Sequence, residues 1–339
     1  MSSILPEAKC CQLIDFRNCF VQHAALIQAM SSLNRLKNNQ LFGGEQQCML
    51  LLGDTGTGKS KLINEFYSAF PSYREGDVLV KPVLVSRIPS KPDVEKMMIQ
   101  LLSDLGQFGS EARKGSRRET GLAEALIKVL KKCKTQIIII NEFQELIEFK
   151  SVEDRQRVAN RLKLISEQAC IPIVLVGMPW ASEISNEPQW ASRLMCSIEL
   201  PYFKIFKQSD RLEFVRFLKG LALRMGFHEP PPLHSDEILF PLFSATRGEV
   251  RKIKHILDEV LFLALSQGDN TVHKQHFVDV LDNVFFDKDN PFKLPIDDVP
   301  LSEVSRYASY NRYSSVESET FIGTQFGRKI STRELFSKN

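Results

Sequence analysis

A glycine-rich loop of eight residues constrains this chain more than any other feature. It follows a short apolar run over residues 48–52, typical of a buried strand, and precedes a helical pattern over 61–70. Glycines let backbone N–H groups turn toward phosphate oxygens, so such a loop between a strand and a helix is typical of nucleotide-binding proteins. The loop consists of Gly53, Asp54, Thr55, Gly56, Thr57, Gly58, Lys59 and Ser60.

This pattern predicts a site for ATP and Mg²⁺. The loop backbone would hold the phosphates, Lys59 would reach the β- and γ-phosphates, and Ser60 would ligate Mg²⁺. The alternative is a glycine turn that arose by chance, and the flanking strand and helix argue against it.

Strands alternate with helices as far as residue 200, which predicts an α/β fold with a parallel sheet between helices. Further strands are predicted at 82–88, 136–141 and 171–177 from their runs of β-branched and other apolar residues. Helices are predicted at 12–38, 121–133 and 153–169, and another opens at Pro92 and Asp93.

Near Pro201 the pattern changes to helical periods only, which predicts a small all-helical subdomain. One helix there, near 272–282, is expected to begin at a Thr271 cap. The expected organisation is an N-terminal helical segment, an ATPase core, a helical lid and an extended tail. Their bounds are 1–40, 41–205, 206–289 and 290–339.

The tail is rich in serine and tyrosine, and alone it is expected to be extended or disordered. Tyr307, Tyr310 and Tyr313 recur at every third position. They either form a peptide that orders on a partner protein or another subunit, or belong to a loose terminus.

Composition and charge limit the classes of partner, metal site and cellular compartment that this chain can have. The net charge of +3 is small for 339 residues, so nucleic-acid binding would have to come from local clusters. The seven cysteines include no C-x-x-C pair, which argues against a zinc site and favours reduced thiols in a cytoplasm. We expect no membrane association, because no signal sequence and no membrane-length apolar run is found.

A second polar element follows the 136–141 strand. Proteins with this phosphate loop normally carry Asp and then Glu there, to hold Mg²⁺ and orient the attacking water. Here Asn141 brings no charge, although it can accept a hydrogen bond from a metal-bound water, and Glu142 is present. Glu142 is the expected catalytic carboxylate, and the alternative is that it only ends the strand. Met178, after the next strand, cannot contact a phosphate as a polar residue would.

Three segments resemble the TnsC/TniB family of AAA+ transposition regulators, and the resemblance extends over residues 12–285. They are PVLVSRIPSKPDVEKMMIQLLSDLG (82–106), NEFQEL (141–146) and VGMPWASEISNEPQWASRLMCSIELP (176–201). The chain is most similar to the TnsC of CRISPR-associated transposons.

The resemblance implies an AAA+ fold and a bacterial ATPase that oligomerises on double-stranded DNA. Its other partners would be a target selector of the TniQ/TnsD type and the transposase subunits TnsA and TnsB. Slow, assembly-dependent hydrolysis would fit the neutral Asn141.

The resemblance also implies roles for two arginines. Arg193 matches a candidate arginine finger, which would reach the ATP of a neighbouring subunit. Arg251 matches the lid arginine that reports bound ATP. Each could instead be a surface charge, and Arg155, Arg157 and Arg161 are competing candidates for the role of Arg193.

Positive charge is concentrated in residues 111–134, which carry eight basic and three acidic residues. A basic loop just before a helix start suits phosphate contacts without base reading. The expected DNA-binding residues are Arg113, Lys114, Arg117, Arg118 and Thr120. An ordinary solvated loop is the alternative, and Lys128 to Lys134 are expected to form the exposed face of a helix.

The sequence leaves two other classes of protein function open. A replication or helicase-loader ATPase would share the phosphate loop and lid, although no winged-helix pattern follows the lid. A small-molecule kinase would share the loop, but it would need a substrate-binding signature that we do not find.

Overall fold

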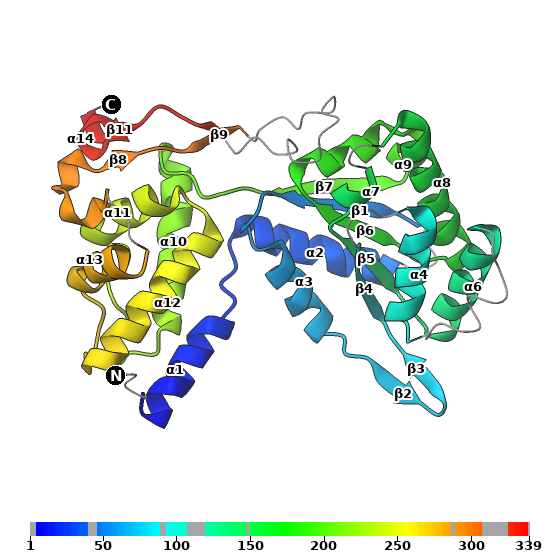
Figure 1. Ribbon diagram of the computed structural model, residues 1–339, viewed down its shortest axis with the longest axis horizontal. Helices are drawn as coiled ribbons and strands as arrows, with labels where there is room; N and C mark the ends of the chain where they lie inside the picture. The colour runs from blue at the N-terminus through cyan, green and yellow to red at the C-terminus, as the bar shows by residue number, and fades with distance from the viewer. Residues whose placement is uncertain are drawn as a thin grey trace.

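One parallel sheet organises the first two thirds of the chain. The computed structural model describes residues 5–39, 46–88, 93–106, 119–147, 150–285, 289–306 and 325–337. Within these ranges five strands pair in the order β4-β5-β6-β1-β7, and every neighbouring pair is parallel (Figure 1). They are β1 (Cys48–Gly53), β4 (Val83–Arg87), β5 (Ile137–Asn141), β6 (Ile173–Gly177) and β7 (Leu194–Leu200). The predicted α/β fold is confirmed.

Helices cover both faces of this sheet, as a parallel sheet requires. Because side chains alternate along a strand, Met49 and Leu51 pack on one face and Leu50 and Leu52 on the other. The first face carries α2 (Ala24–Asn39) and α3 (Lys59–Ser68). The second face carries α4 (Val94–Asp104), α6 (Glu119–Lys132), α8 (Val152–Ala169) and α9 (Pro188–Ala191). Two short helices complete the core, α7 (Gln144–Ile147) and η2 (Pro179–Asn186).

The prediction of one helix over 12–38 is wrong. The structure has α1 (Glu7–Asn18) and then α2, separated by an extended segment at residues 19–23. Leu13 and Phe16 of α1 pack into the lid, whereas α2 packs against the sheet. One continuous helix cannot serve both cores, so tertiary packing overrides the helical period. Ile27 shows the difference, because the helical period of 12–38 places it on the apolar face and the structure leaves it 53% exposed.

Four helices form the lid, and they have their own hydrophobic core. They are α10 (Gln208–Arg224), α11 (Asp236–Thr246), α12 (Val250–Gln267) and α13 (Lys274–Asn283). Contrary to expectation, α13 is capped by His273 and not by Thr271. The His273 N–H donates to His276 Nδ1 at 3.0 Å, which satisfies a backbone donor at the helix start.

The described parts of the tail fold onto the lid, which corrects the expectation of an extended or disordered terminus. Phe292, Val299 and Leu301 are buried in the lid core. The Glu303 carboxylate also accepts hydrogen bonds from the N–H groups of Ile205 and Phe206, at 2.6 and 2.7 Å. The tail elements are η3 (Pro291–Lys293), η4 (Ile296–Asp298), β8 (Pro300–Leu301), β9 (Val304–Arg306), β10 (Gln325–Phe326), β11 (Ile330–Ser331) and α14 (Thr332–Ser337). Tyr307, Tyr310 and Tyr313 lie outside the described residues.

A small hairpin projects from the core, formed by β2 (Tyr73–Glu75) and β3 (Val78–Val80) (Figure 1). The sequence pattern predicts neither this hairpin nor β7. Both have largely exposed or half-exposed residues, so neither shows the continuous apolar run of the central strands. Among the described helices, none has the length and apolar character needed to cross a membrane.

Candidate nucleotide site

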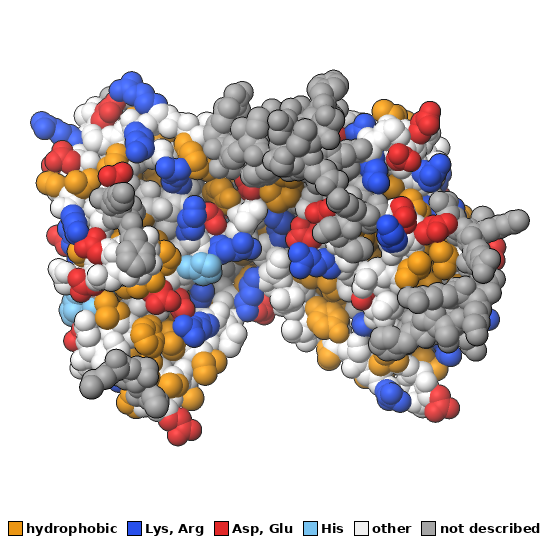
Figure 2. Space-filling model, in the orientation of Figure 1, with side chains coloured by type: hydrophobic (Ala, Val, Ile, Leu, Met, Phe, Trp, Pro, Cys, Tyr) orange, Lys and Arg blue, Asp and Glu red, His pale blue; other side chains and the backbone are white. Residues whose placement is uncertain are grey.

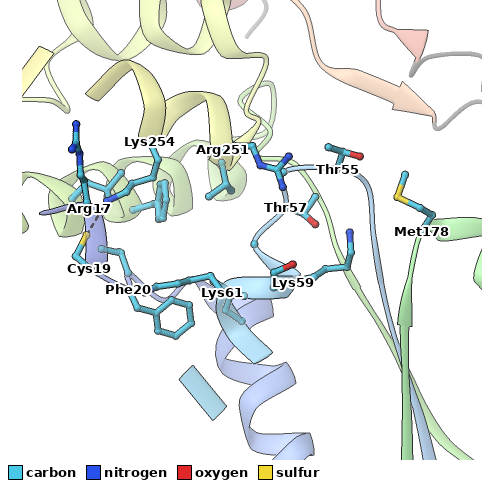
Figure 3. A pocket seen from close by; sticks show the side chains of 18 of the residues that line it. Arg17, Cys19, Phe20, Thr55, Thr57, Lys59, Lys61, Met178, Arg251 and Lys254 are labelled. Carbon is cyan, nitrogen blue, oxygen red and sulfur yellow. Dashed lines mark hydrogen bonds between the residues drawn. The ribbon is translucent and has the colours of Figure 1, made fainter. Parts of the chain in front are cut away.

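A cavity of about 540 Å³ lies where the phosphate loop, the 19–23 segment and the lid meet. Six lysines and arginines and one carboxylate line it, so the cavity suits a polyanion. Figure 3 shows several of these cationic side chains around it, and Figure 2 shows basic side chains gathered along the hollow between core and lid. The charged lining residues are Arg17, Lys59, Lys61, Arg87, Arg251, Lys254 and Glu142.

The phosphate loop has the backbone geometry that its glycines predict. Gly56 and Gly58 have φ angles of 80° and 97°, which L side chains rarely adopt. A Cβ on Gly56 would lie 2.5 Å from Glu249 Oε1, so the loop also needs glycine for the lid to approach. Thr57 Oγ1 donates to the Asp54 carbonyl at 2.9 Å and closes the turn.

Lys59 is held within the loop by two carbonyls. Its Nζ donates to the Gly53 and Asp54 oxygens at 2.6 and 2.9 Å. Burial lowers the pKa of Lys59 to about 8, against the opposing influence of Glu142 and Asp54, and nearby Arg251 lowers it further. Burial also raises the pKa of the Asp54 carboxyl, although the Thr55 N–H donates to it at 2.6 Å. A buried ammonium in an electropositive cavity would be stabilised by phosphate oxygens.

The lid contacts the loop directly. The Arg251 N–H donates to the Gly56 carbonyl at 3.0 Å. Tyr202, in the segment between β7 and the lid, also donates its hydroxyl to the Thr55 carbonyl at 2.7 Å. The Arg251 side chain points into the cavity near Thr57 and Lys59 (Figure 3). The structure thus brings the predicted lid arginine beside the predicted phosphate loop.

Glu142 faces the same cavity from the end of β5. Its φ of 59° is left-handed, and its N–H donates to Asn141 Oδ1 at 3.1 Å. Gln144 Nε2 donates to the Glu142 carboxylate at 2.7 Å. Met178 also lines the cavity, and its N–H donates to Gln144 Oε1 at 3.2 Å. The site therefore presents a carboxylate opposite the phosphate loop, as a water-orienting group requires.

The residues present fit ATP with Mg²⁺. Ser60 lies in the first turn of α3 and lines the cavity, where a serine hydroxyl suits a hard cation. In the described part of the chain, no group of three His, Cys, Asp or Glu residues is placed to hold a metal ion. A cation here would therefore rely on Ser60 and the phosphates, and it would neutralise phosphate charge during transfer.

Arg193 lies at the opposite end of the sheet from the phosphate loop. Its carbonyl accepts from the Cys48 N–H at 2.8 Å, at the start of β1, whereas Gly53 ends that strand. The two ends of β1 are about 16 Å apart at the usual rise per residue. The Arg193 guanidinium, 25% exposed, pairs with Glu167 on α8. Arg193 is thus not brought to the cavity of its own chain.

Arg155, a competing candidate for the role of Arg193, has a largely buried side chain and pairs with Glu183 at 2.6 Å.

The predicted DNA residues Arg113, Lys114, Arg117 and Arg118 lie outside the described residues. For Thr120 the backbone is described, in the first turn of α6, but not the side chain. Lys128, Lys131, Lys132 and Lys134 are exposed, as expected.

Sequence reasoning missed the apolar half of the cavity. Phe20, Val21 and Leu26 line it from the N-terminal segment, and Phe217 and Leu221 line it from α10. An apolar wall beside a cationic one suits a base joined to phosphates. The sequence does carry a signal for Lys254 as a further cavity residue, because it lies three residues after Arg251 and therefore on the same face of α12.

A family model described as bacterial TniB protein matches residues 16–205, which is more than half of the chain. The chain belongs to the TniB family. TniB proteins are transposition-associated AAA+ ATPases, and membership implies ATP binding and hydrolysis. No curated protein matches the chain.

Solved structures of AAA+ proteins share the fold. The ORC2 protein of Aeropyrum pernix, in ADPNP–ADP complexes, has a TM-score of 0.55 and 17% identity over 76% of this chain and 67% of that one. Cdc6p from Pyrobaculum aerophilum has a TM-score of 0.53 and 14% identity over 81% and 68%. The ORC1 protein of A. pernix in complex with DNA has a TM-score of 0.52 and 17% identity over 80% and 68%. At these identities the likeness shows the fold alone.

Proposed function

We propose that this TniB-family protein is an ATP-dependent regulator of DNA transposition that assembles on double-stranded DNA. The proposal rests on the distance between the phosphate-loop cavity and Arg193, the expected arginine finger of an ATP site. The cavity holds the phosphate loop, Glu142 and Arg251, whereas Arg193 lies at the other end of β1. A second copy would supply Arg193 to this cavity, so hydrolysis would depend on assembly.

Within the assembled site, each residue of the chain has a specific role. The loop backbone and Lys59 would bind the β- and γ-phosphates, Ser60 would hold Mg²⁺, and Asn141 would accept a hydrogen bond from a water on that ion. Glu142 orients the attacking water, and Arg251 docks the lid onto the loop when ATP is bound. The neutral Asn141 and the apolar Met178 make hydrolysis slow, so bound ATP acts first as a link between subunits.

DNA binding is proposed for the basic segment before α6, through Arg113, Lys114, Arg117 and Arg118, and for Thr120 in the first turn of α6. The charge of residues 111–134 and the exposed lysines of α6 support contacts to phosphates without base reading. The partners proposed with DNA are a TniQ/TnsD-type target selector and the transposase subunits TnsA and TnsB. We place the protein in the bacterial cytoplasm, closest in role to the TnsC of CRISPR-associated transposons.

Each proposed domain has its own part in these functions. Residues 1–40 form the N-terminal helical segment, from which Phe20, Val21 and Leu26 line the apolar side of the cavity, 41–205 form the ATPase core, 206–289 form the lid and 290–339 form the tail. The described tail packs on the lid, so a partner bound to the tyrosine segment would act on the lid that contacts ATP.

The experiment is electron microscopy and sedimentation of the purified protein with ATP, a slowly hydrolysed ATP analogue or ADP, with and without duplex DNA. Rings or filaments on DNA that require ATP support the proposal, and K59A should abolish them. The double reversal R117E/R118E should weaken binding to all duplex sequences alike and reduce its salt dependence. Arg216, exposed on α10, provides the matched control R216E.

Other outcomes favour other functions. A monomer that transfers the γ-phosphoryl group of ATP to a small-molecule acceptor, releasing ADP, and ignores DNA would favour a kinase. ATP-dependent capture of a replicative helicase, with no response to transposase or target selector, would favour a helicase loader. Either result would overturn the proposal.

A further inference from the structure

Gln144 joins the ends of two neighbouring strands beside the cavity. It begins α7 and is only 6% exposed. Its Nε2 donates to Glu142 Oε2 at 2.7 Å, and its Oε1 accepts from the Met178 N–H at 3.2 Å. One buried amide therefore links the carboxylate after β5 to the backbone after β6.

The surrounding backbone leaves room for this amide and fixes it. A Cβ on Gly177 would lie 2.6 Å from Gln144 Oε1, so the close approach depends on glycine there. The Phe143 N–H donates to the Val176 carbonyl at 2.9 Å, which holds the start of α7 against β6. Glu142 has little freedom left, because its backbone is left-handed and its carboxylate is bound.

We propose that Gln144 is a positioning residue for ATP hydrolysis, which acts by holding the Glu142 carboxylate toward the cavity. The inference rests on the proposed function, in which Glu142 orients the water. The amide occupies one carboxylate oxygen and leaves the other for that water. It also ties Glu142 to the end of β6, where Met178 cannot make a polar contact with a phosphate.

The amide's two hydrogen bonds can be separated by substitution. Q144E keeps an acceptor for the Met178 N–H but places a carboxylate against Glu142 in place of the donor. Q144M removes both hydrogen bonds at similar size. G177A keeps the glutamine and displaces its amide. The matched control is Q275E on α13, because Gln275 Nε2 also donates to a carboxylate, that of Asp279, at 2.8 Å on the lid surface.

Four quantities are measured on the full-length protein with DNA: kcat, the Kd for ATP, the lifetime of ATP-dependent oligomers and Tm. We expect Q144E, Q144M and G177A to lower kcat at least about tenfold, as misplacement of a catalytic group does. The Kd should stay within about threefold, because phosphate binding is unchanged. Oligomers should persist longer than those of the wild type, and Q275E should change none of these quantities.

A Q144E protein that hydrolyses ATP at the wild-type rate would overturn the inference, since this variant keeps the acceptor for the Met178 N–H and loses the donor to Glu142. A purely structural role predicts that kcat and Kd change together and in proportion to the loss of Tm. If Q144M fails to fold, Q144E and G177A distinguish the positioning role from the structural one. A wild-type protein without ATPase activity in any assembly would instead overturn the proposed function, and this inference with it.

Discussion

ATP binding by this protein should take up a proton at mildly alkaline pH. Burial lowers the pKa of Lys59 in the free protein to about 8, so about half of the molecules carry a neutral Lys59 at pH 8. Phosphate oxygens would favour the ammonium and restore the pKa toward its ordinary 10.5. Because the bound form holds the proton that the free form loses, affinity falls as pH rises from 8 toward 10.5.

The size of the effect follows from these two pKa values. Between pH 7.5 and 9 the Kd for ATP should rise about eightfold, and about half a proton should be taken up per ATP at pH 8. Isothermal titration calorimetry with a slowly hydrolysed ATP analogue, in buffers of different ionisation enthalpy, measures both quantities.

Two variants shift the midpoint in opposite directions. Glu142 raises the Lys59 pKa and Arg251 lowers it, so E142Q should move the midpoint of proton uptake down and R251Q should move it up. An affinity that is flat between pH 7.5 and 9, with no proton uptake, would refute the claim that the buried Lys59 meets the phosphates.

Three further perturbations test particular contacts. E142Q should lower kcat by about 10²- to 10⁴-fold with little change in the Kd for ATP, and unchanged hydrolysis would exclude Glu142 as the water-orienting group. G56A should weaken ATP binding and lower stability by more than G76A does. Both glycines have positive φ, but only the Gly56 Cβ would meet Glu249, and equal losses of Tm would contradict lid docking. E303A should destabilise the protein by about 2 to 4 kcal/mol, because two backbone N–H groups lose a charged acceptor, whereas E303Q should lose less. Urea unfolding measures both variants, and an E303A protein as stable as the wild type would show that Glu303 does not stabilise the segment at Ile205 and Phe206.

Much of the core could be predicted from the sequence because its signals are local. Four of the five sheet strands are mainly apolar runs, and the phosphate loop is fixed by glycine spacing. The sequence predicts a helix that opens at Pro92 and Asp93, and Asp93 caps α4, where its carboxylate accepts from the Lys96 N–H at 2.7 Å. These features depend on neighbours in the chain, so their patterns are visible without the fold.

The parts that the sequence did not predict depend on distant contacts. The break at residues 19–23 exists because α1 and α2 pack on different cores. The tail orders because Phe292 and Leu301 complete the lid core, although no period marks them. The Gln144 bridge joins residues 34 apart in sequence, and nothing in a local pattern indicates it. The apolar wall of the cavity likewise forms only when α10 meets the N-terminal segment.

The central claim is that each ATP site is completed by Arg193 of a second copy. Mixing K59A protein with R193A protein tests it most directly, with ATP and duplex DNA present. Each variant alone should be inactive, whereas an equimolar mixture should recover up to about one quarter of the wild-type ATPase rate, since that share of interfaces pairs an intact loop with an intact arginine. A mixture of K59A with an R193A/E142Q protein should stay inactive. Full ATPase activity of R193A alone, or no recovery in a mixture that still assembles on DNA, would contradict the account.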